Sequence, residues 1–251
     1  MIQNEKEKFI RVSKEIAKAN SVSIYTHVNP DCDTLSCALS LRIALISLGK
    51  QVDVYSVDPV PKTLCVLNGA DSVKLPEKKV HDLSIAVDCD SLERIGNAMR
   101  SFLSSKVQIA IDHHKTHAKF ADVTLLDTDV SACAEIVYRL LTYMKLMSKD
   151  VAELLFAGIV TDSGCFQFSS VSETTHKIAG ELMSYGFDGG KVIYDVFKKT
   201  SVNKFMLENR VLSKCKFFDD NQIAIITFTA KDFEETSTSM NDTLGTIVGV
   251  I

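Results

Sequence analysis

Histidine and aspartate side chains follow three apolar stretches of this sequence. His27 follows SVSIYT, Asp88 follows LSIAV, and residues 112–114 (DHH) include the end of VQIAID. Apolar, β-branched runs of this length predict buried strands. Because the carboxyl ends of parallel strands line the crevice where ligands bind, residues far apart in the sequence are expected to meet there. Imidazole and carboxylate groups together are typical ligands of divalent metal ions.

Two further segments add carboxylates to this set. The loop HVNPDCD supplies Asp31 and Asp33, and Asp33 can also cap the helix that follows. Asp162 lies in TDSG, where a glycine ends a helical run. Any one such aspartate is as often a turn residue or a helix cap, and a lone histidine is more often a hydrogen-bonded structural residue. The histidines that we interpret as structural are His81, His117 and His176.

Oxygen and imidazole donors make up the set of candidate metal ligands. They are His27, Asp31, Asp33, Asp88, His113 and Asp162. Four carboxylates opposite two divalent cations give a nearly neutral site that can accept an anionic phosphate, and these donors favour Mn²⁺ or Mg²⁺. Two such ions about 3.5–4 Å apart can share a bridging hydroxide nucleophile. For the neighbouring Cys32, Cys89 and Cys165, we favour a role as small apolar filler over thiolate ligation.

The elements that must position these residues alternate along the first part of the chain. Apolar residues at helical spacing predict an opening helix over residues 2–19. Strand-like and helical runs then follow at 21–27 (strand), 33–49 (helix), 51–57, 83–88 and 107–112 (strands). This alternation predicts an α/β fold with a mainly parallel sheet and helices on both faces.

The pattern changes at Ser131, where consecutive helices begin. A helix, a turn and a second helix are expected within 192–215, and QIAIITFT at 222–229 predicts a strand. The domains that we expect are a catalytic domain over 1–188, a helical linker over 189–215 and the start of a small, shortened α+β domain over 216–251.

Composition restricts the class of protein. The chain has 251 residues, is 46% hydrophobic and 24% charged, and carries a formal net charge of −4. These are the proportions of a globular protein, and a weakly acidic chain argues against binding to long duplex nucleic acid. The N-terminus has no signal-peptide pattern, and no apolar run has the length of a membrane span. Seven cysteines without a CxxC pair argue against a disulfide scaffold, so we expect a cytoplasmic protein without a membrane partner.

The order of the candidate motifs resembles that of the DHH phosphoesterase family. Four motifs occur in the family's order: HVNPDCD, VDCD, the DHH tripeptide and TDSG. Similarity continues through DVSACAEIVYRLL and the helix after SETTHKIAGELMSYGFD, and it covers roughly residues 20–190.

The resemblance implies two metal-binding groups that share one ligand. The first group is His27, Asp31 and Asp88; the second is Asp33, Asp88, His113 and Asp162. Asp88 would therefore bridge the two ions. In the family pattern His114 faces the substrate and stabilises the pentacovalent phosphate or the leaving group, while Asp112 orients a histidine, as carboxylates near metal sites commonly do. No other substrate-binding residue is assigned.

The compact domain and helical linker are similar to the family branch of bifunctional oligoribonucleases that also act as phosphatases on 3′-phosphoadenosine 5′-phosphate (pAp). The resemblance implies an Mn²⁺-dependent hydrolase whose substrate is pAp or short single-stranded RNA. An exopolyphosphatase or an inorganic pyrophosphatase with the same site is an alternative, as is a nucleotide-binding regulatory protein with impaired catalysis. Whether the chain forms a homodimer is left open.

Two features depart from the family pattern. Cys32 replaces the glycine between the paired aspartates and Ser36–Cys37 replace the Gly-Ser after them, so we expect a slightly rearranged first loop. The glycine-rich GGGH-type motif of the family's second domain does not occur before Ile251. We interpret the apolar run TLGTIVGVI at 243–251 as part of a shortened second domain, an element awaiting a partner.

Overall fold

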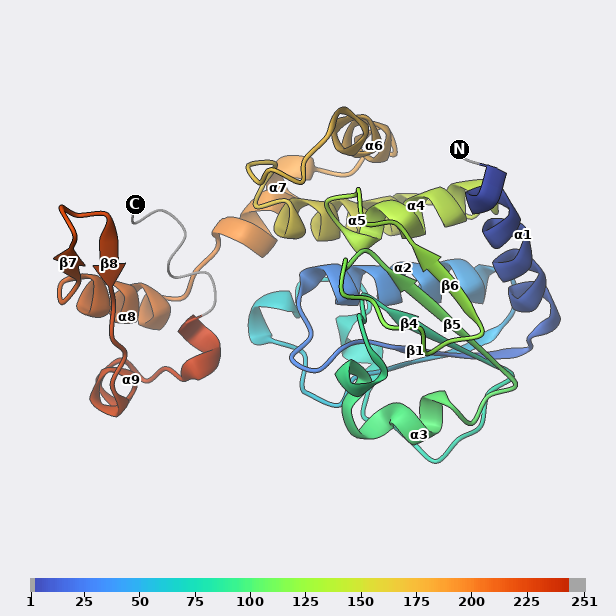
Figure 1. Cartoon of the computed structure of the whole chain (residues 1–251), viewed down its shortest axis with the longest axis horizontal. Helices are drawn as coiled ribbons and strands as arrows, with labels where there is room; N and C mark the ends of the chain where they lie inside the picture. The colour runs from blue at the N-terminus through green and yellow to red at the C-terminus, as the bar shows by residue number, and fades with distance from the viewer. Residues whose placement is uncertain (1–2, 244–251) are drawn as a thin grey trace. The chain divides into compact units, whose positions relative to one another are not determined.

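The computed structural model describes residues 3–243, and it divides after Lys198 into two compact units (Figure 1). The described part of the first unit contains a parallel sheet with the strand order β3-β2-β1-β4-β5-β6. Its strands are β1 (Ser21–Tyr25), β2 (Gln51–Tyr55), β3 (Val73–Lys74), β4 (Leu83–Val87), β5 (Val107–Asp112) and β6 (Val123–Leu126). The predicted α/β fold with a mainly parallel sheet is confirmed.

Helices cover both faces of this sheet, which buries its strands on either side (Figure 1). On one face lie α1 (Gln3–Lys18), α2 (Cys32–Ser47) and α4 (Cys133–Tyr143), with α5 (Lys149–Asp162) packed against α2 and α4. On the other lie the 3₁₀ segment η3 (Leu92–Ala98) and α3 (Met99–Phe102). Helix α2 is apolar around most of its circumference because it is enclosed between the sheet and α5.

Neighbouring residues of each strand contribute to different cores. Ile24 and Ile85 pack into the larger core under α2, whereas Tyr25 and Ala86 pack into the smaller core around Phe102. This alternation follows from the two-residue period of a strand. The sheet is therefore fixed on both sides, and it provides a rigid edge on which to hold a site.

The order of the strands changes direction between β1 and β4. The chain leaves β1 through α2 toward β2, and it leaves β4 toward β5 on the opposite side. Loops that part in opposite directions at such a point leave space at the carboxyl ends of the two strands. The residues that directly follow β1 and β4 include His27 and Asp88.

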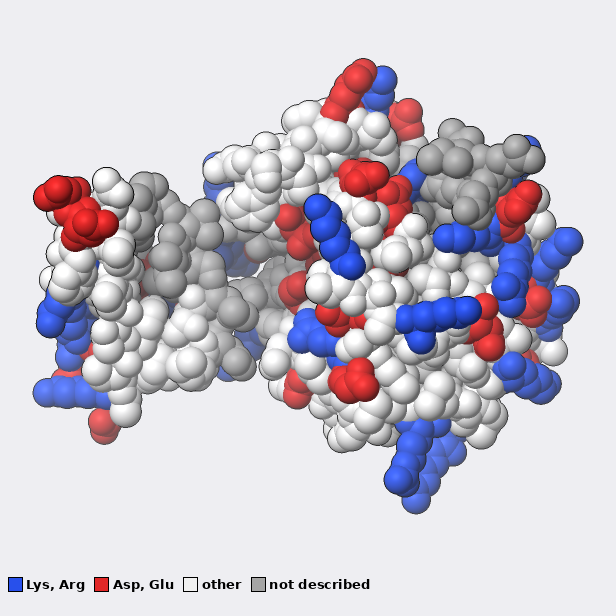
Figure 2. Space-filling view, viewed as in Figure 1, with Lys and Arg blue, Asp and Glu red and all other residues white. Residues whose placement is uncertain are grey.

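The remaining elements of the first unit lie in its connections and its last part. They are η1 (Lys62–Leu64), η2 (Ala70–Ser72), α6 (Glu173–Met183), α7 (Gly189–Ile193) and a π-helical turn, η4 (Tyr194–Lys198). Over this unit, basic and acidic side chains are interspersed on the face shown in Figure 2. In the described part of the chain, no helix is long and apolar enough to cross a membrane.

The second unit contains two helices, a hairpin and a 3₁₀ turn within its described part. These are α8 (Val202–Leu212), β7 (Lys216–Phe218), β8 (Ile223–Ile225), α9 (Ala230–Thr236) and η5 (Met240–Thr243). The strand expected over 222–229 is three residues long, because only these residues pair with β7. All but the first residue of the apolar run at 243–251 lies outside the described residues.

Candidate metal centre

The structure brings all the candidate ligands to the carboxyl edge of the sheet. They come from the ends of β1, β4 and β5, from the first turn of α2 and from the last residue of α5. Three groups have ligand atoms within 4.8 Å of one another: His27, Asp31 and Asp88; Asp33, His113 and Asp162; and Asp88, His113 and His114.

His27 is oriented by its own backbone. Its Nδ1 lies 2.7 Å from the carbonyl oxygen of Val28, so an N–H at Nδ1 donates to that oxygen and leaves the lone pair of Nε2 available for a ligand. This Nε2 lies 3.4 Å from Oδ2 of Asp31 and 3.5 Å from Oδ2 of Asp88. The three donors therefore converge on one point.

His113 forms the corresponding contacts on the other side of Asp88. Its Nε2 lies 3.4 Å from Oδ1 of Asp88 and 3.4 Å from Oδ2 of Asp162. Asp88 thus presents Oδ2 to His27 and Oδ1 to His113. A single carboxylate that offers a different oxygen to each of two donor groups can bridge two cations.

Asp88 has two features that fit a bound cation. Its backbone adopts a left-handed conformation, with φ of 58°, which is unusual for a residue other than glycine and is found preferentially at functional sites. Its Oδ1 is buried and has no hydrogen-bond partner among the described residues. An unsatisfied buried carboxylate oxygen is costly, and a cation would satisfy it.

The spacing of the donors also fits. Ligand atoms that share one ion at about 2.1 Å are about 3.0–3.4 Å apart, from octahedral to tetrahedral angles. The contacts of His27 and His113 with the aspartates, at 3.4–3.5 Å, lie close to this range.

The charges of the cluster are unbalanced. Burial lowers the pKa of His27, but hydrogen bonds with Asp31 and Asp88 raise it overall to about 10. His113 behaves in the same way: burial lowers its pKa, and Asp88 is the largest cause of its rise to about 10. Burial raises the pKa of Asp162 to about 7 against the opposing effect of His113. The carboxylates therefore keep protons on their imidazole neighbours, and divalent cations can replace those protons.

Asp33 does not cap the helix in which it lies, contrary to the sequence interpretation. Asp31 is the N-cap of α2, with its Oδ1 accepting from the backbone N–H of Thr34 at 3.1 Å. Asp33 instead accepts from the backbone N–H groups of Cys133 at 2.6 Å and Ala134 at 3.1 Å, at the start of α4. Burial, followed by repulsion from nearby carboxylates, raises the pKa of Asp33. The positive end of the α4 dipole offsets part of that repulsion.

The carboxylate of Asp33 fits in its position because Gly158 has no side chain. A Cβ atom on this residue of α5 would lie 2.6 Å from Oδ1 of Asp33 and 3.1 Å from Cβ of Ala134. Real Cβ atoms do not approach so closely, so any larger residue at position 158 would move the carboxylate. A role for this glycine was not predicted from the sequence.

Asp112 lies behind His114. Its carboxylate is fully buried, whereas the side chain of His114 is 43% exposed, and Oδ1 of Asp112 accepts a hydrogen bond from Nδ1 of His114 at 2.8 Å. His117, interpreted above as structural, lies 2.6 Å from Oδ2 of the same carboxylate through its Nδ1. The spacing of three residues from His114 was the available signal, since a turn brings such positions together.

Several cysteine thiols lie close to Asp33. Those of Cys32, Cys37 and Cys133 are buried, and Sγ of Cys37 lies 3.6 Å from Oδ1 of Asp33. Burial raises the pKa of Cys32 and that of Cys133 to about 12, so these thiols stay protonated at neutral pH. Within residues 3–243, the potential metal-binding groups contain no cysteine.

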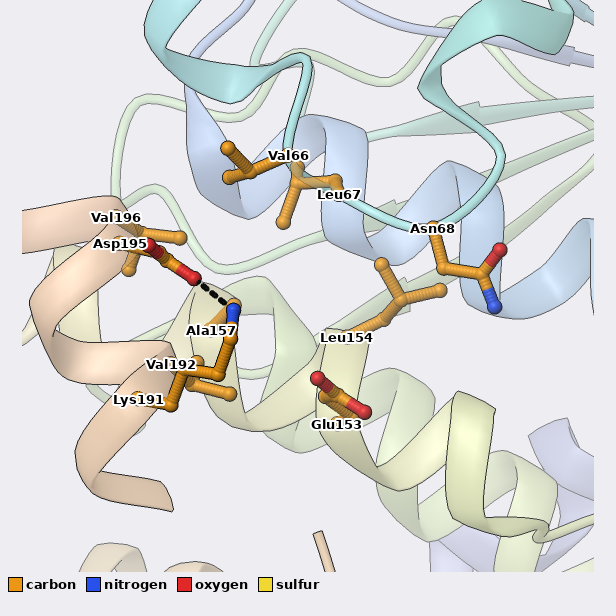
Figure 3. A pocket seen from close by; sticks show the side chains of 10 residues that line it. All are labelled: Val66, Leu67, Asn68, Glu153, Leu154, Ala157, Lys191, Val192, Asp195 and Val196. Atoms are coloured by element: carbon orange, nitrogen blue, oxygen red, sulfur yellow. Dashed lines mark hydrogen bonds and ion pairs between the residues drawn. The ribbon is translucent and has the colours of Figure 1, made fainter. Parts of the chain in front are cut away.

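The hollows on the described part of the first unit include two with contrasting linings. One is lined by Lys115, the residue after His114, together with Thr128–Val130 and Ser169–Ser172. The other lies between the Val66–Asn68 loop, α5 and the end of the unit (Figure 3). Its lining is largely apolar, and two of its charged residues, Lys191 and Asp195, form an ion pair with each other. The second hollow thus lacks the converging donors of the sheet edge.

Comparison with known proteins agrees with the motif order. The family described as "DHH family, N-terminal domain" matches residues 21–159, more than half of the chain. The bifunctional oligoribonuclease and PAP phosphatase NrnA of Bacillus subtilis is 26% identical over 94% of this chain and 77% of its own length. The protein of that name from Thermus thermophilus is 30% identical over 83% of this chain and 64% of its own length.

Two further similarities concern other phosphate chemistry. A probable manganese-dependent inorganic pyrophosphatase of Shouchella clausii is 26% identical over 71% of this chain and 61% of its own length. The crystal structure of an exopolyphosphatase-related protein from Bacteroides fragilis superposes with a TM-score of 0.90 at 26% identity, over 96% of this chain and 75% of that one. The chain spans less than two thirds of the length of the Thermus thermophilus and Shouchella clausii relatives.

Proposed function

The chain belongs to the DHH family, and from this membership we propose that it is a metal-dependent phosphoesterase that hydrolyses pAp or short single-stranded oligoribonucleotides. The observation that carries the proposal is the position of Asp88, which offers one oxygen to each of two donor groups. The substrates come from relatives whose names include both activities.

The six candidate ligands would hold two divalent ions, with Mn²⁺ as the proposed metal. His27, Asp31 and Asp88 would hold the first; Asp33, Asp88, His113 and Asp162 would hold the second. Two such ions supply a hydroxide nucleophile at neutral pH and neutralise charge on the phosphoryl oxygens. The donor chemistry, four carboxylates and two imidazoles, suits Mn²⁺ better than thiolate-preferring metals.

His114 is the residue that we assign to the leaving group. The hydrogen bond with Asp112 is the largest cause of its raised pKa, so its imidazolium form is favoured. Since Nδ1 is bound to Asp112, Nε2 is the nitrogen that can donate a proton to the leaving oxygen. Its partly exposed side chain is accessible to a bound phosphate ester.

The hollow that contains Lys115 would accommodate the rest of the substrate. Its lining combines the ammonium group of Lys115 and the carboxylate of Asp129 with hydroxyl groups, which belong to Thr128, Ser169, Ser170 and Ser172. Hydroxyl and ammonium donors suit the ribose and phosphate groups of a nucleotide. Binding of a small substrate in this hollow would not depend on a strongly basic protein surface, which agrees with the net charge of −4.

A second candidate function is hydrolysis of inorganic pyrophosphate or polyphosphate by the same residues. The observation that favours it is the similarity to the pyrophosphatase of Shouchella clausii and to the exopolyphosphatase-related structure. The metal-binding residues alone do not separate these substrates from nucleotides, because all of them present a phosphoryl group to the ions.

A substrate panel tests the proposal. The chain is incubated with Mn²⁺ and, separately, pAp, a diribonucleotide, pyrophosphate and polyphosphate, with a chelator as control. We expect chelator-sensitive release of phosphate from pAp or of mononucleotide from the diribonucleotide. Turnover of pyrophosphate or polyphosphate alone would favour the second candidate. Metal and nucleotide binding without any turnover would indicate a regulatory binding protein.

A further inference from the structure

The carboxylate of Asp112 lies between two imidazole rings. Oδ1 accepts from Nδ1 of His114 at 2.8 Å, and Oδ2 accepts from Nδ1 of His117 at 2.6 Å. The side chain of Asp112 is 0% exposed and that of His117 is 4% exposed, so water does not compete for this second bond. Each oxygen of the carboxylate thus has its own histidine donor.

The turn that carries both histidines is held in place. The backbone N–H of His117 donates to the carbonyl oxygen of His114 at 3.2 Å. The hydroxyl of Thr116 donates to Oδ2 of Asp90 at 3.0 Å, and the backbone N–H of Ala118 donates to the carbonyl oxygen of Asp90 at 2.6 Å. Because Asp90 lies just after β4, the turn is fixed relative to the strand that precedes Asp88.

We propose that His117 is a positioning residue, which holds Asp112 by its second oxygen so that the first oxygen keeps His114 directed at the substrate. The inference rests on the proposed function. An aspartate carboxylate rotates within a broad torsional range, so a single hydrogen bond leaves its plane poorly defined. A second bond to the other oxygen fixes the plane and therefore the direction of the His114 ring.

The opposite edge of the sheet supplies a matched control. His81, which precedes the amino end of β4, is also buried and contacts an aspartate, with its Nε2 2.9 Å from Oδ2 of Asp53. Nδ1 of His81, like Nε2 of His117, is buried without a hydrogen-bond partner among the described residues. Substitution of His81 therefore removes a similar buried His–Asp bond away from the candidate centre.

The test compares H117L, H117N and H81L in the full chain with Mn²⁺. Leucine removes the donor, whereas the amide of asparagine can place an N–H near the position of Nδ1. We expect H117L to lower kcat about 10- to 100-fold, as loss of a group that orients an active-site residue does. KM and Mn²⁺ affinity should stay close to wild type, H117N should recover most of kcat, and H81L should leave kcat unchanged.

Nitrogen-15 NMR of the histidine rings gives a reading that does not need turnover. The His114 ring signals should shift in H117L, return toward wild type in H117N and stay in place in H81L. Unchanged His114 signals and unchanged kcat in H117L would overturn the inference. A kcat loss in H117L that H81L reproduces would also overturn it. A wild-type chain that hydrolyses no substrate contradicts the proposed function instead, and the NMR comparison still tests His117.

Discussion

Asp53, a partly buried residue of β2, and Asp88, a buried residue that follows β4, have very different surroundings. Asp53 accepts from Lys79 at 2.7 Å, from His81 at 2.9 Å and from Lys74 at 3.1 Å. Asp88, in contrast, has an oxygen without a hydrogen-bond partner among the described residues, a left-handed backbone and only histidines as cationic neighbours. Two lysines and a histidine pair with Asp53, whereas Asp88 is paired only with histidines, whose protons a divalent cation can replace. A buried carboxylate oxygen without a hydrogen-bond partner, on a residue with an unusual backbone conformation, is the pattern expected of a functional site.

The largest expected effect comes from substitution of Asp88. In D88N the amide nitrogen cannot bind a cation and the amide oxygen carries no full charge, so the bridge between the two donor groups is lost and the Mn²⁺-dependent rate should fall on the order of 10²–10³-fold or more. The control is D53N, which removes a carboxylate of the same sheet and should leave the rate unchanged. Full activity in D88N, measured as kcat on pAp or a diribonucleotide, would contradict the bridging role.

The next effect separates His114 from the metal ligands. H114Q removes the proposed proton donor but leaves the six ligands intact, so kcat should fall about 10²–10⁴-fold. Mn²⁺ affinity, measured by isothermal titration calorimetry, should change little. If H114Q instead loses metal and keeps kcat at saturating Mn²⁺, then His114 is a ligand and not a proton donor.

A smaller effect is expected at Gly158. In G158A the new methyl group meets Oδ1 of Asp33, and displacement of this carboxylate should lower kcat about 10- to 100-fold. G180A makes the same change within α6, where nothing lies within 4 Å of the new Cβ. This control should keep full activity. Equal activity in the two variants would show that the close approach at position 158 has no catalytic importance.

The smallest effect concerns the contribution of the Asp53 carboxylate to the free energy of unfolding. Burial raises the pKa of Asp53, but hydrogen bonds from Lys79, His81 and Lys74 lower it overall below its usual value of about 3.9. A carboxylate with a lowered folded-state pKa stabilises the fold above the unfolded value, and this contribution is lost as the pH falls through the folded-state pKa.

Thermal unfolding at several pH values checks this contribution. D53N should cost about 1–3 kcal/mol at pH 7, and its stability difference from wild type should shrink below about pH 4. A difference that stays constant down to pH 2 would contradict the assignment to the Asp53 carboxylate.

The candidate ligands could be chosen from the sequence more readily than the groups that hold them in position. His27, Asp88 and His113 were chosen as candidate ligands because apolar strands precede them and because the motif order is distinctive. The partner of Asp33 was not predictable, since the α4 N–H groups that bind it lie 100 and 101 residues away in the sequence. The sequence places two aspartates, Asp31 and Asp33, at the start of one helix, and residue type alone does not show which of them is the N-cap.

Side-chain direction and weak strands account for the other differences. His117 was not assigned to the centre, because residue type and spacing do not show that both oxygens of Asp112 would be occupied. Strands β3, β6 and β7 were not predicted, because they have two to four residues each and carry little periodic signal. Strand β8 was expected to be longer, since apolar residues continue past its last paired position.

If Asp88 joins two ions, the spectrum of the bound metal will show it. Chain loaded with Mn²⁺ and freed of excess metal is examined by metal analysis and by electron paramagnetic resonance. We expect two Mn²⁺ per chain with a spin-coupled spectrum in the wild type, and loss of the coupling in D88N. One ion per chain, or two ions without coupling in the wild type, would contradict it.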